Sequence, residues 1–367
     1  MQTERAIILH ADTDYSSLGR ARQSFSETLR KQERKIAILE GVSGGALCHA
    51  VTNPGSTRFI NGGATPYSRE EKIRLGVPKQ IIESYGEYSP QTARAMALLA
   101  RWKEGTDLGI GITGSLESNE NVFVSYVLGR EKPLEEIIHL NAKTRRSMKN
   151  ELTVRVLSSA NLLLNGKRKI FNAIPFINEP ADLFLEERNL LTSNAEKVVA
   201  VCKENALTLG TMESCTGLMM ANAITDIAGC SDIFQGGFLA YNENVKRDLG
   251  VPFEIMRRGG VYSKEVAAAM AEATRARMGV KVSFATTGVM DVWDTRPYHD
   301  KTEPGTISLA IAQEGRETWC ETRHFDVATR DKMKIAITNY MFEQFLLLSA
   351  TERRELSKRQ TLYVSRF

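Results

Sequence analysis

Residues 207–249 read LTLGTMESCTGLMMANAITDIAGCSDIFQGGFLAYNENVKRDL, and this segment decides how the rest of the chain is interpreted. An apolar run typical of a β-strand, 207–212, stops at the turn-like residues 213–217, and a helical run, 218–227, follows directly. Ser214, on this strand-to-helix turn, is expected at a helix N-terminus, where unpaired N–H groups and the helix dipole favour negative charge. The segment therefore predicts an α/β fold with a site suited to a nucleophile that attacks a carbonyl group.

Lys246 and Tyr241 complete a candidate catalytic group with Ser214. Lysine is the commonest replacement for histidine as the base that activates a serine. Such a base must be neutral, so the ordinary lysine pKa of about 10.4 has to be lowered by burial or by a nearby cation. Tyr241 could donate to the substrate or position Lys246. Cys215 would be a stronger nucleophile as a thiolate, but neighbouring side chains at a turn point differently, and we interpret it as a buried structural cysteine.

Each of these residues also has an ordinary structural interpretation. Serine is common as a helix N-cap, where it contributes about 1 kcal/mol. A lone lysine on a helix is usually solvated, and a strand tyrosine is often half buried. The residue types alone therefore leave both interpretations open.

Four motifs of this region resemble the CinA C-terminal domain family. E-S-C-T-G, A-G-x-S-x-x-F, G-G-x-x-x-Y-x-x-x-x-K and L-G-V-P occur in the order of that family and at about its spacing, within a resemblance that covers residues 194–348. The characterised members are nicotinamide-nucleotide amidohydrolases, which deamidate nicotinamide mononucleotide. The resemblance thus implies a serine–lysine amidohydrolase that releases ammonia from the carboxamide of a pyridine nucleotide and needs no cofactor.

The resemblance also implies which residues bind the substrate. Thr287 and Gly288 match family residues that line the active site, and backbone N–H groups near Thr216 and Gly217 are expected to hold the oxyanion. Arg330 matches a family arginine before the last helix. Its guanidinium could hold a phosphate bidentately, or it could form a surface salt bridge.

The loop 289–300 departs from the family pattern, in which a glycine-rich stretch of the type T-G-I-A-G-P-G-G stands. Here it is bulky, acidic and aromatic. Trp293 or Tyr298 could stack on a ring, Asp291 or Asp294 could bind a ribose, or these side chains could fill the pocket. This departure bears more on the identity of the substrate, which it leaves open, than on the type of reaction.

No metal site is predicted. His299 and His324 are lone histidines without metal-ligand spacing. The acidic residues around His299 could in principle ligate a metal, but surface or structural roles are the simpler interpretation.

The chain contains an internal repeat with a spacing of about 174 residues. The clearest matches place Tyr67 and Lys72 where Tyr241 and Lys246 stand later, and residues 75–78 repeat as L-G-V-P at 249–252. We predict two tandem CinA C-terminal-like α/β/α layered domains that form an internal pseudo-dimer. Their ranges are 1–165 for a degenerate domain, 166–192 for a linker, 193–350 for the amidohydrolase domain and 351–367 for a charged tail.

The first copy lacks the nucleophile, because Gly41 stands at the position of Ser214. Lys72, Tyr67 and Arg145 remain, and Ser43 lies two residues on and is expected to face another way. We predict that this copy is catalytically dead. It could still bind a ligand, or serve as an inactive partner that completes the fold.

Composition narrows the function classes. The five cysteines are odd in number and contain no C-x-x-C pair, which indicates reduced thiols and a cytoplasmic location. The N-terminus lacks the pattern of a signal peptide, and no apolar run reaches the length of a membrane span. The net charge of +4 comes from interleaved charges, so neither nucleic acid nor membrane is expected as a partner. The expected partner is a small-molecule nucleotide substrate. Whether the chain also forms a homo-oligomer is left open by the sequence.

A rival from another class is a catalytically inactive nucleotide-binding or scaffold protein of the same family. The missing serine in the first copy and the rebuilt loop in the second favour it. Ammonia release from nicotinamide mononucleotide would discriminate between the two.

Overall fold

The computed structural model describes residues 16–103, 105–116, 121–168, 184–290, 302–327 and 329–364, with side chains up to residue 350. The predictions made for the N-terminal residues, for most of the linker and for the loop after Met290 lie outside these residues. The same holds for the side chains of the charged tail.

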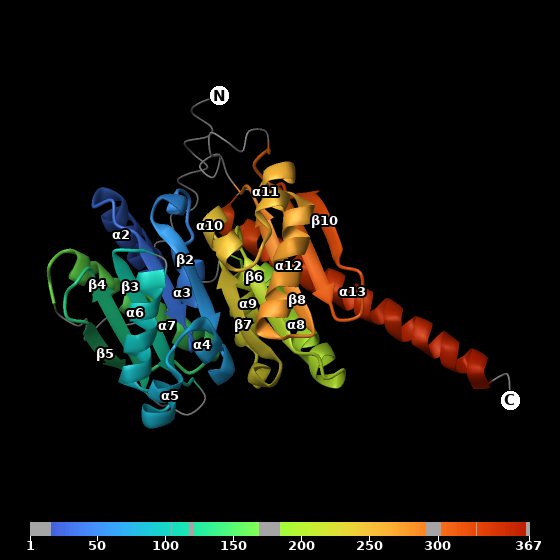
Figure 1. Cartoon of the computed structure of the whole chain (residues 1–367), viewed down its shortest axis with the longest axis horizontal. Coiled ribbons are helices and arrows are strands. Elements are labelled where there is room, and N and C mark those ends of the chain that lie inside the picture. Colours follow the sequence, from blue (N-terminus) through green and yellow to red (C-terminus); the bar gives the residue numbers. More distant parts are fainter. Residues whose placement is uncertain are drawn as a thin grey trace.

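The chain forms the same series of elements twice, coloured blue to green and yellow to red in Figure 1. The first copy consists of α2 (Ser17–Lys31), β1 (Ile36–Glu40), α3 (Ala46–Val51), η1 (Ser56–Arg58), β2 (Ile60–Pro66), α4 (Arg69–Leu75), α5 (Lys79–Tyr85), α6 (Pro90–Lys103), β3 (Leu108–Gly114), β4 (Val122–Leu128), β5 (Leu134–Ile138) and α7 (Arg145–Leu164). The second copy consists of α8 (Leu185–Glu204), β6 (Leu209–Glu213), α9 (Met219–Thr225), η2 (Cys230–Asp232), β7 (Phe234–Leu239), α10 (Glu243–Asp248), α11 (Phe253–Gly259), α12 (Lys264–Met278), β8 (Val282–Gly288), β9 (Thr306–Gln313), β10 (Trp319–His324) and α13 (Arg330–Val364). The tandem repeat predicted from the sequence is confirmed.

In the described part of the chain, ten strands form one sheet with the order β10-β9-β8-β6-β7-β2-β1-β3-β4-β5. Within each copy the three inner strands are parallel, and the two outer strands are antiparallel. The carboxyl ends of the parallel strands of one copy therefore lie at the same edge. In the second copy, that edge carries the turn after β6, which contains Ser214.

The two copies join through β2 and β7, which pair antiparallel. Gly63 lies opposite Leu239, and Thr65 lies opposite Gly237, so equivalent residues exchange places across the pair. This is the isologous pattern of a twofold dimer, here within one chain. Gly237 is needed for close packing, because a Cβ there would lie 2.5 Å from Thr211 Oγ1 on β6. The predicted pseudo-dimer is therefore a single continuous sheet.

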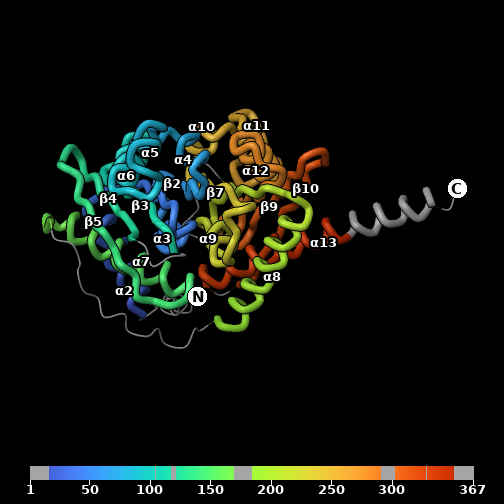
Figure 2. The backbone as a smooth tube through the Cα atoms, turned by 90° about the horizontal axis from the view of Figure 1, so that it is seen from below, coloured from blue at the N-terminus to red at the C-terminus, as the bar shows by residue number. Residues whose placement is uncertain are grey.

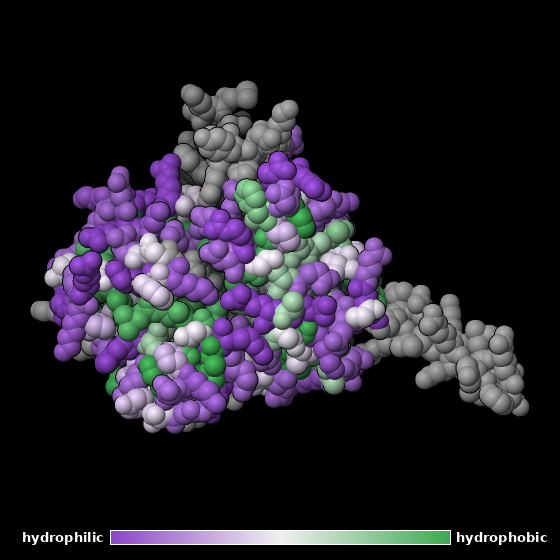
Figure 3. Space-filling view, in the orientation of Figure 1, coloured by the Kyte–Doolittle hydropathy of each residue, from purple (hydrophilic) through white to green (hydrophobic). Residues whose placement is uncertain are grey.

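Helices cover both faces of this sheet (Figures 1 and 2). Successive strand residues point to opposite faces, so Ile38 of β1 joins one core and Leu39 the other. The first core packs α2, α3 and α7 with α8, α9 and α13, and the second packs α4 and α6 with α10, α11 and α12. Both cores contain residues of both copies. The predicted α/β/α layering is confirmed. Most of the face of the molecule that Figure 3 shows is hydrophilic.

Some element bounds differ from the prediction. Helix α8 begins at Leu185, within the range 166–192 that the sequence analysis assigned to the linker. The strand expected from residue 207 begins at Leu209, because the Leu207 N–H still bonds the Cys202 carbonyl at the end of α8. Strands β5 and β10 were not predicted, since their charged residues hide the alternation that marks a strand.

Ser89 and Ser263 cap the N-terminal ends of α6 and α12 with their side chains. The Ser89 hydroxyl accepts from the Thr92 N–H, and the Ser263 hydroxyl accepts from the Val266 N–H. Among the described residues, none of the helices combines the length and the apolar character that crossing a bilayer requires.

Candidate active site

Ser214 lies directly after β6, on the turn that leads to α9. Its N–H bonds the Thr286 carbonyl of β8 at 3.0 Å, which ties the turn to the neighbouring strand. Gly217 and Leu218 both have left-handed backbones, with φ of 66° and 70°, and they reverse the chain into the helix. Leu218 is the N-cap of α9, so the interpretation of Ser214 as an N-cap serine is wrong. The Ser214 hydroxyl is left to line a pocket.

Glu213, the residue before the serine, holds the start of α9 instead. Its buried carboxylate accepts the N–H groups of Met220 and Ala221 at 3.1 and 3.0 Å, and the Thr216 hydroxyl at 2.7 Å. Burial raises the pKa of Glu213, while these hydrogen bonds lower it. Glu40 does the same for α3 in the first copy. The sequence prediction missed this role.

Replacing Glu213 with alanine is expected to lower the free energy of unfolding by roughly 2–4 kcal/mol, because two buried amides and the hydroxyls of Thr211 and Thr216 lose an acceptor. Denaturant unfolding measures this change. Glu40→Ala should have an effect of similar size, since Glu40 accepts the matching N–H groups of Leu47 and Cys48. A loss below about 0.5 kcal/mol, as at an ordinary surface site, would contradict this role.

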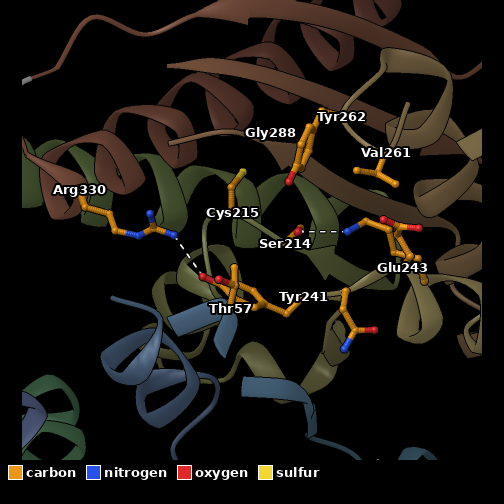
Figure 4. A pocket seen from close by; sticks show the side chains of 11 residues that line it. Thr57, Ser214, Cys215, Tyr241, Glu243, Val261, Tyr262, Gly288 and Arg330 are labelled. Carbon is orange, nitrogen blue, oxygen red and sulfur yellow. Dashed lines mark hydrogen bonds between the residues drawn. The ribbon is translucent and has the colours of Figure 1, made fainter. Parts of the chain in front are cut away.

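Lys246 reaches Ser214 from α10. Asn242 starts this helix by accepting the Val245 N–H, and one turn later the Lys246 side chain points inward. Its Nζ lies 3.2 Å from Ser214 Oγ and 2.8 Å from the carbonyl oxygen of Ala240 (Figure 4). Only 2% of Lys246 is exposed, so the interpretation as a solvated lysine is wrong. A buried amine in contact with a serine hydroxyl is the geometry of a base and its nucleophile.

Tyr241 and Arg330 form the other side of the site. The Arg330 guanidinium donates to the Tyr241 hydroxyl at 3.2 Å (Figure 4) and to the Thr52 carbonyl at 3.2 Å. Tyr241 also shares a hydrogen bond of 2.7 Å with Ser56. Arg330 is 7% exposed, so it is a buried residue of the pocket and not part of a surface pair.

The structure brings five of the eight predicted site residues into one pocket. Its lining consists of Thr57, Ser214, Cys215, Tyr241, Asn242, Glu243, Lys246, Val261, Tyr262, Gly288 and Arg330 (Figure 4). Thr216, Gly217 and Thr287 lie behind this lining. Thr216 bonds Glu213, the Gly217 N–H is donated to the Ser214 carbonyl, and the Thr287 hydroxyl is donated to the Val261 carbonyl.

Tyr262 and Thr57 are two of the lining residues that were not expected from the sequence. Tyr262 directs its hydroxyl toward Ser214 in Figure 4, and its only sequence signal was that it repeats Tyr88. Thr57 comes from the first copy and enters the pocket across the junction. No pattern within the second copy could have identified a residue that lies about 160 positions earlier.

The matching place in the first copy is organised differently. Lys72 Nζ forms an ion pair of 3.0 Å with Glu87, whereas Val261 stands at the place of Glu87 in the second copy. Burial lowers the pKa of Lys72, and the Glu87 carboxylate opposes that shift. Ser43 donates to Glu40 at 2.6 Å, which confirms that it faces away. With Gly41 at the position of the serine, the first copy is degenerate.

Among the described residues, no three His, Cys, Asp or Glu side chains come together as metal ligands. The acidic, aromatic and histidine residues that the sequence singled out at 291–299 lie outside that part of the chain. Their predicted contacts with a substrate or a metal stay predictions.

Comparison with known proteins identifies the family. The model of the "CinA C-terminal domain" matches residues 20–123 and 191–348, one segment in each copy. The chain belongs to the CinA C-terminal domain family. The two matched segments correspond to the two copies, so this chain carries the CinA domain twice.

Each of two curated relatives matches less than half of this chain. A CinA-like protein of Akkermansia muciniphila is 33% identical over 173 residues, which are 47% of this chain and 39% of that protein. A CinA-like protein of Desulfovibrio desulfuricans is 43% identical over 90 residues, which are 24% and 21% of the two chains. This chain thus spans less than half the length of these relatives.

Solved structures of the family are similar to this chain as well. The competence/damage inducible protein CihA from Agrobacterium tumefaciens is 26% identical and has a TM-score of 0.40. The match covers 43% of this chain and 95% of that one.

Proposed function

We propose that this CinA-family protein is a serine–lysine amidohydrolase that acts on the carboxamide of a pyridine nucleotide such as nicotinamide mononucleotide. The observation that carries the proposal is the 3.2 Å contact between Lys246 Nζ and Ser214 Oγ in a pocket that also holds Arg330. The resemblance to nicotinamide-nucleotide amidohydrolases supports the reaction and the substrate class. Lys246 is buried, as a lysine base requires, because burial disfavours the charged form of an amine.

In the proposed reaction, neutral Lys246 takes the proton of Ser214 while Oγ attacks the carboxamide carbon. The tetrahedral intermediate collapses when Lys246 returns that proton to the leaving nitrogen, and ammonia departs. An ester between Ser214 and the pyridine carboxyl group remains. Lys246 then takes a proton from water, whose oxygen attacks the ester carbon. When the ester bond to Ser214 breaks, Lys246 returns that proton to Ser214 Oγ, and the acid is released.

We assign the oxyanion to backbone N–H groups of the turn after Ser214, as the sequence predicts for Thr216 and Gly217. The Gly217 N–H is donated to the Ser214 carbonyl at 3.2 Å in this conformation. Gly217 can serve the oxyanion only if that turn bond opens. The Tyr262 hydroxyl, which points toward Ser214, is a further donor at this end of the pocket.

Arg330 is proposed to bind the phosphate of the nucleotide. Arg330→Gln should raise the KM for nicotinamide mononucleotide roughly 10- to 100-fold, because a charge-assisted hydrogen bond is lost. Nicotinamide riboside has no phosphate, so its kcat/KM should change much less. Arg145→Gln is the matched control, since Arg145 makes the same contacts with Tyr67 and the Thr225 carbonyl in the first copy.

Steady-state kinetics with the two substrates checks this prediction. An equal loss on the mononucleotide and the riboside would show that Arg330 shapes the pocket without binding a phosphate. A similar loss in Arg145→Gln would assign the effect to the fold.

The wild-type protein tests the proposed function directly. Incubation with nicotinamide mononucleotide is expected to release ammonia and nicotinate mononucleotide in equal amounts. Calorimetric binding of the nucleotide without either product would favour the rival function, a nucleotide-binding or scaffold protein.

A further inference from the structure

We infer that the degenerate first copy is part of the active site, because its Ser56 and Thr52 hold Tyr241 and Arg330 in position. This inference rests on the proposed function, and it gives the dead copy a role as a positioning half of the site. It also predicts which of two symmetric residues matters for catalysis.

The contacts across the junction start at Ser56 of η1. Ser56 is fully buried, and its hydroxyl shares a 2.7 Å hydrogen bond with the Tyr241 hydroxyl. Tyr241 accepts from Arg330, and Arg330 donates to the Thr52 carbonyl. Two pocket residues of the second copy are thus fixed by two residues of the first. The next residue, Thr57, lines the pocket itself.

Thr52 is held rigidly in turn. Lys334 of α13 donates to the Thr52 carbonyl at 2.8 Å, to its hydroxyl at 2.7 Å and to the His49 carbonyl at 3.2 Å. These carbonyls lie at the end of α3, where a helix favours a cation. Arg22 of α2 donates to the Ala50 carbonyl and pairs with Asp331 of α13 at 3.0 Å. The end of α3 is therefore anchored from two helices, and it can serve as a fixed support for Arg330.

The contacts that fix Tyr241 and Arg330 form a clamp. An equivalent clamp, related by the pseudo-twofold axis, surrounds Tyr67 in the first copy. Arg145 donates to the Tyr67 hydroxyl at 2.9 Å and to the Thr225 carbonyl at 3.2 Å. Lys149 donates to the Thr225 hydroxyl at 2.8 Å. The counterpart of Ser56 is Cys230, whose sulfur lies 3.7 Å from the Tyr67 hydroxyl.

The two clamps therefore differ in strength and in what they support. The Ser56–Tyr241 bond is a short bond between oxygens, whereas sulfur is a weak donor and acceptor. Of the two clamps, the one with Ser56 supports a site in which a serine lies beside the lysine. The clamp around Tyr67 faces Gly41 and the Lys72–Glu87 ion pair of the first copy. Symmetry thus supplies a control that removes an equivalent contact at the dead site.

The experiment compares Ser56→Ala with Cys230→Ala. We expect Ser56→Ala to raise the KM for nicotinamide mononucleotide about tenfold with little change in kcat, because Tyr241 and Arg330 lose one fixed point. The effect should be smaller on nicotinamide riboside, which does not use Arg330. Ser56→Cys introduces the residue that stands at the equivalent position, Cys230. Its KM should lie between those of Ser56→Ala and the wild type. Cys230→Ala should leave both kinetic constants unchanged.

Calorimetric titration with nicotinamide mononucleotide in a Ser214→Ala background separates this inference from the proposed chemistry. Weaker binding in Ser56→Ala, with no change in Cys230→Ala, would support the inference even if the wild type released no ammonia. Equal binding and equal kcat/KM in the two variants, in a protein that does release ammonia, would overturn it. Thermal unfolding should show similar stabilities, so that a general loss of structure is distinguished from positioning.

Discussion

Ser214→Ala is expected to lower kcat for ammonia release from nicotinamide mononucleotide by about 10⁴-fold or more, because the reaction loses its nucleophile. Steady-state ammonia assays measure this loss. The matched control is Ser43→Ala, which removes the hydroxyl of the first copy. That hydroxyl is bound to Glu40 and faces no site, so kcat should not change.

Residual activity in Ser214→Ala would make Cys215, which also lines the pocket, the alternative nucleophile. If Cys215 were the nucleophile, Cys215→Ala would abolish activity and Ser214→Ala would not. The opposite pattern is predicted here, since Lys246 Nζ contacts Ser214 Oγ.

Lys246→Met should lower kcat by roughly 10²–10⁴-fold, the usual contribution of a general base. Methionine keeps the length and the apolar body of the side chain but has no amine. Lys72→Met is the matched control. Lys72 is as buried as Lys246, but it is paired with Glu87 and has no serine beside it. The control variant should lose some stability and retain kcat.

The pH dependence gives a second measurement on the same variant. A lysine base works only in its neutral form, so the wild-type rate should fall as acid protonates Lys246. Burial lowers the pKa of Lys334 to about 7, so Lys334 changes its charge within the pH range of such a profile. A slope that survives in Lys246→Met would therefore belong to another group such as Lys334. A flat profile in the wild type would contradict the lysine base.

Much of the architecture could be predicted from the repeat. The matching Gly-Gly, Tyr and Lys positions predicted two copies, and the structure joins them through the strands that carry the glycines. The apolar run 207–212, for example, predicted the inner strand β6. The outer strands β5 and β10 were missed because Glu135 and Glu136, or Glu321 and Arg323, replace the expected apolar residues.

The site was predictable where a motif supplied the spacing. Ser214 and Lys246 are 32 residues apart in the chain and were placed together only through the family pattern. The contributions of Ser56, Thr52 and Thr57 were not predictable, since they depend on how two halves dock. The role of Glu213 was missed for another reason. A carboxylate beside a serine suggests chemistry, whereas its hydrogen bonds show a structural cap.

The central claim is that Ser214 is acylated by the carboxamide, and competition between water and hydroxylamine tests it most directly. If an acyl-enzyme forms, hydroxylamine should intercept it, and the ratio of hydroxamate to acid should rise in proportion to the hydroxylamine concentration. Both products should depend on Ser214. Ammonia release with the acid as the sole product at every hydroxylamine concentration, or undiminished release by Ser214→Ala, would contradict the claim.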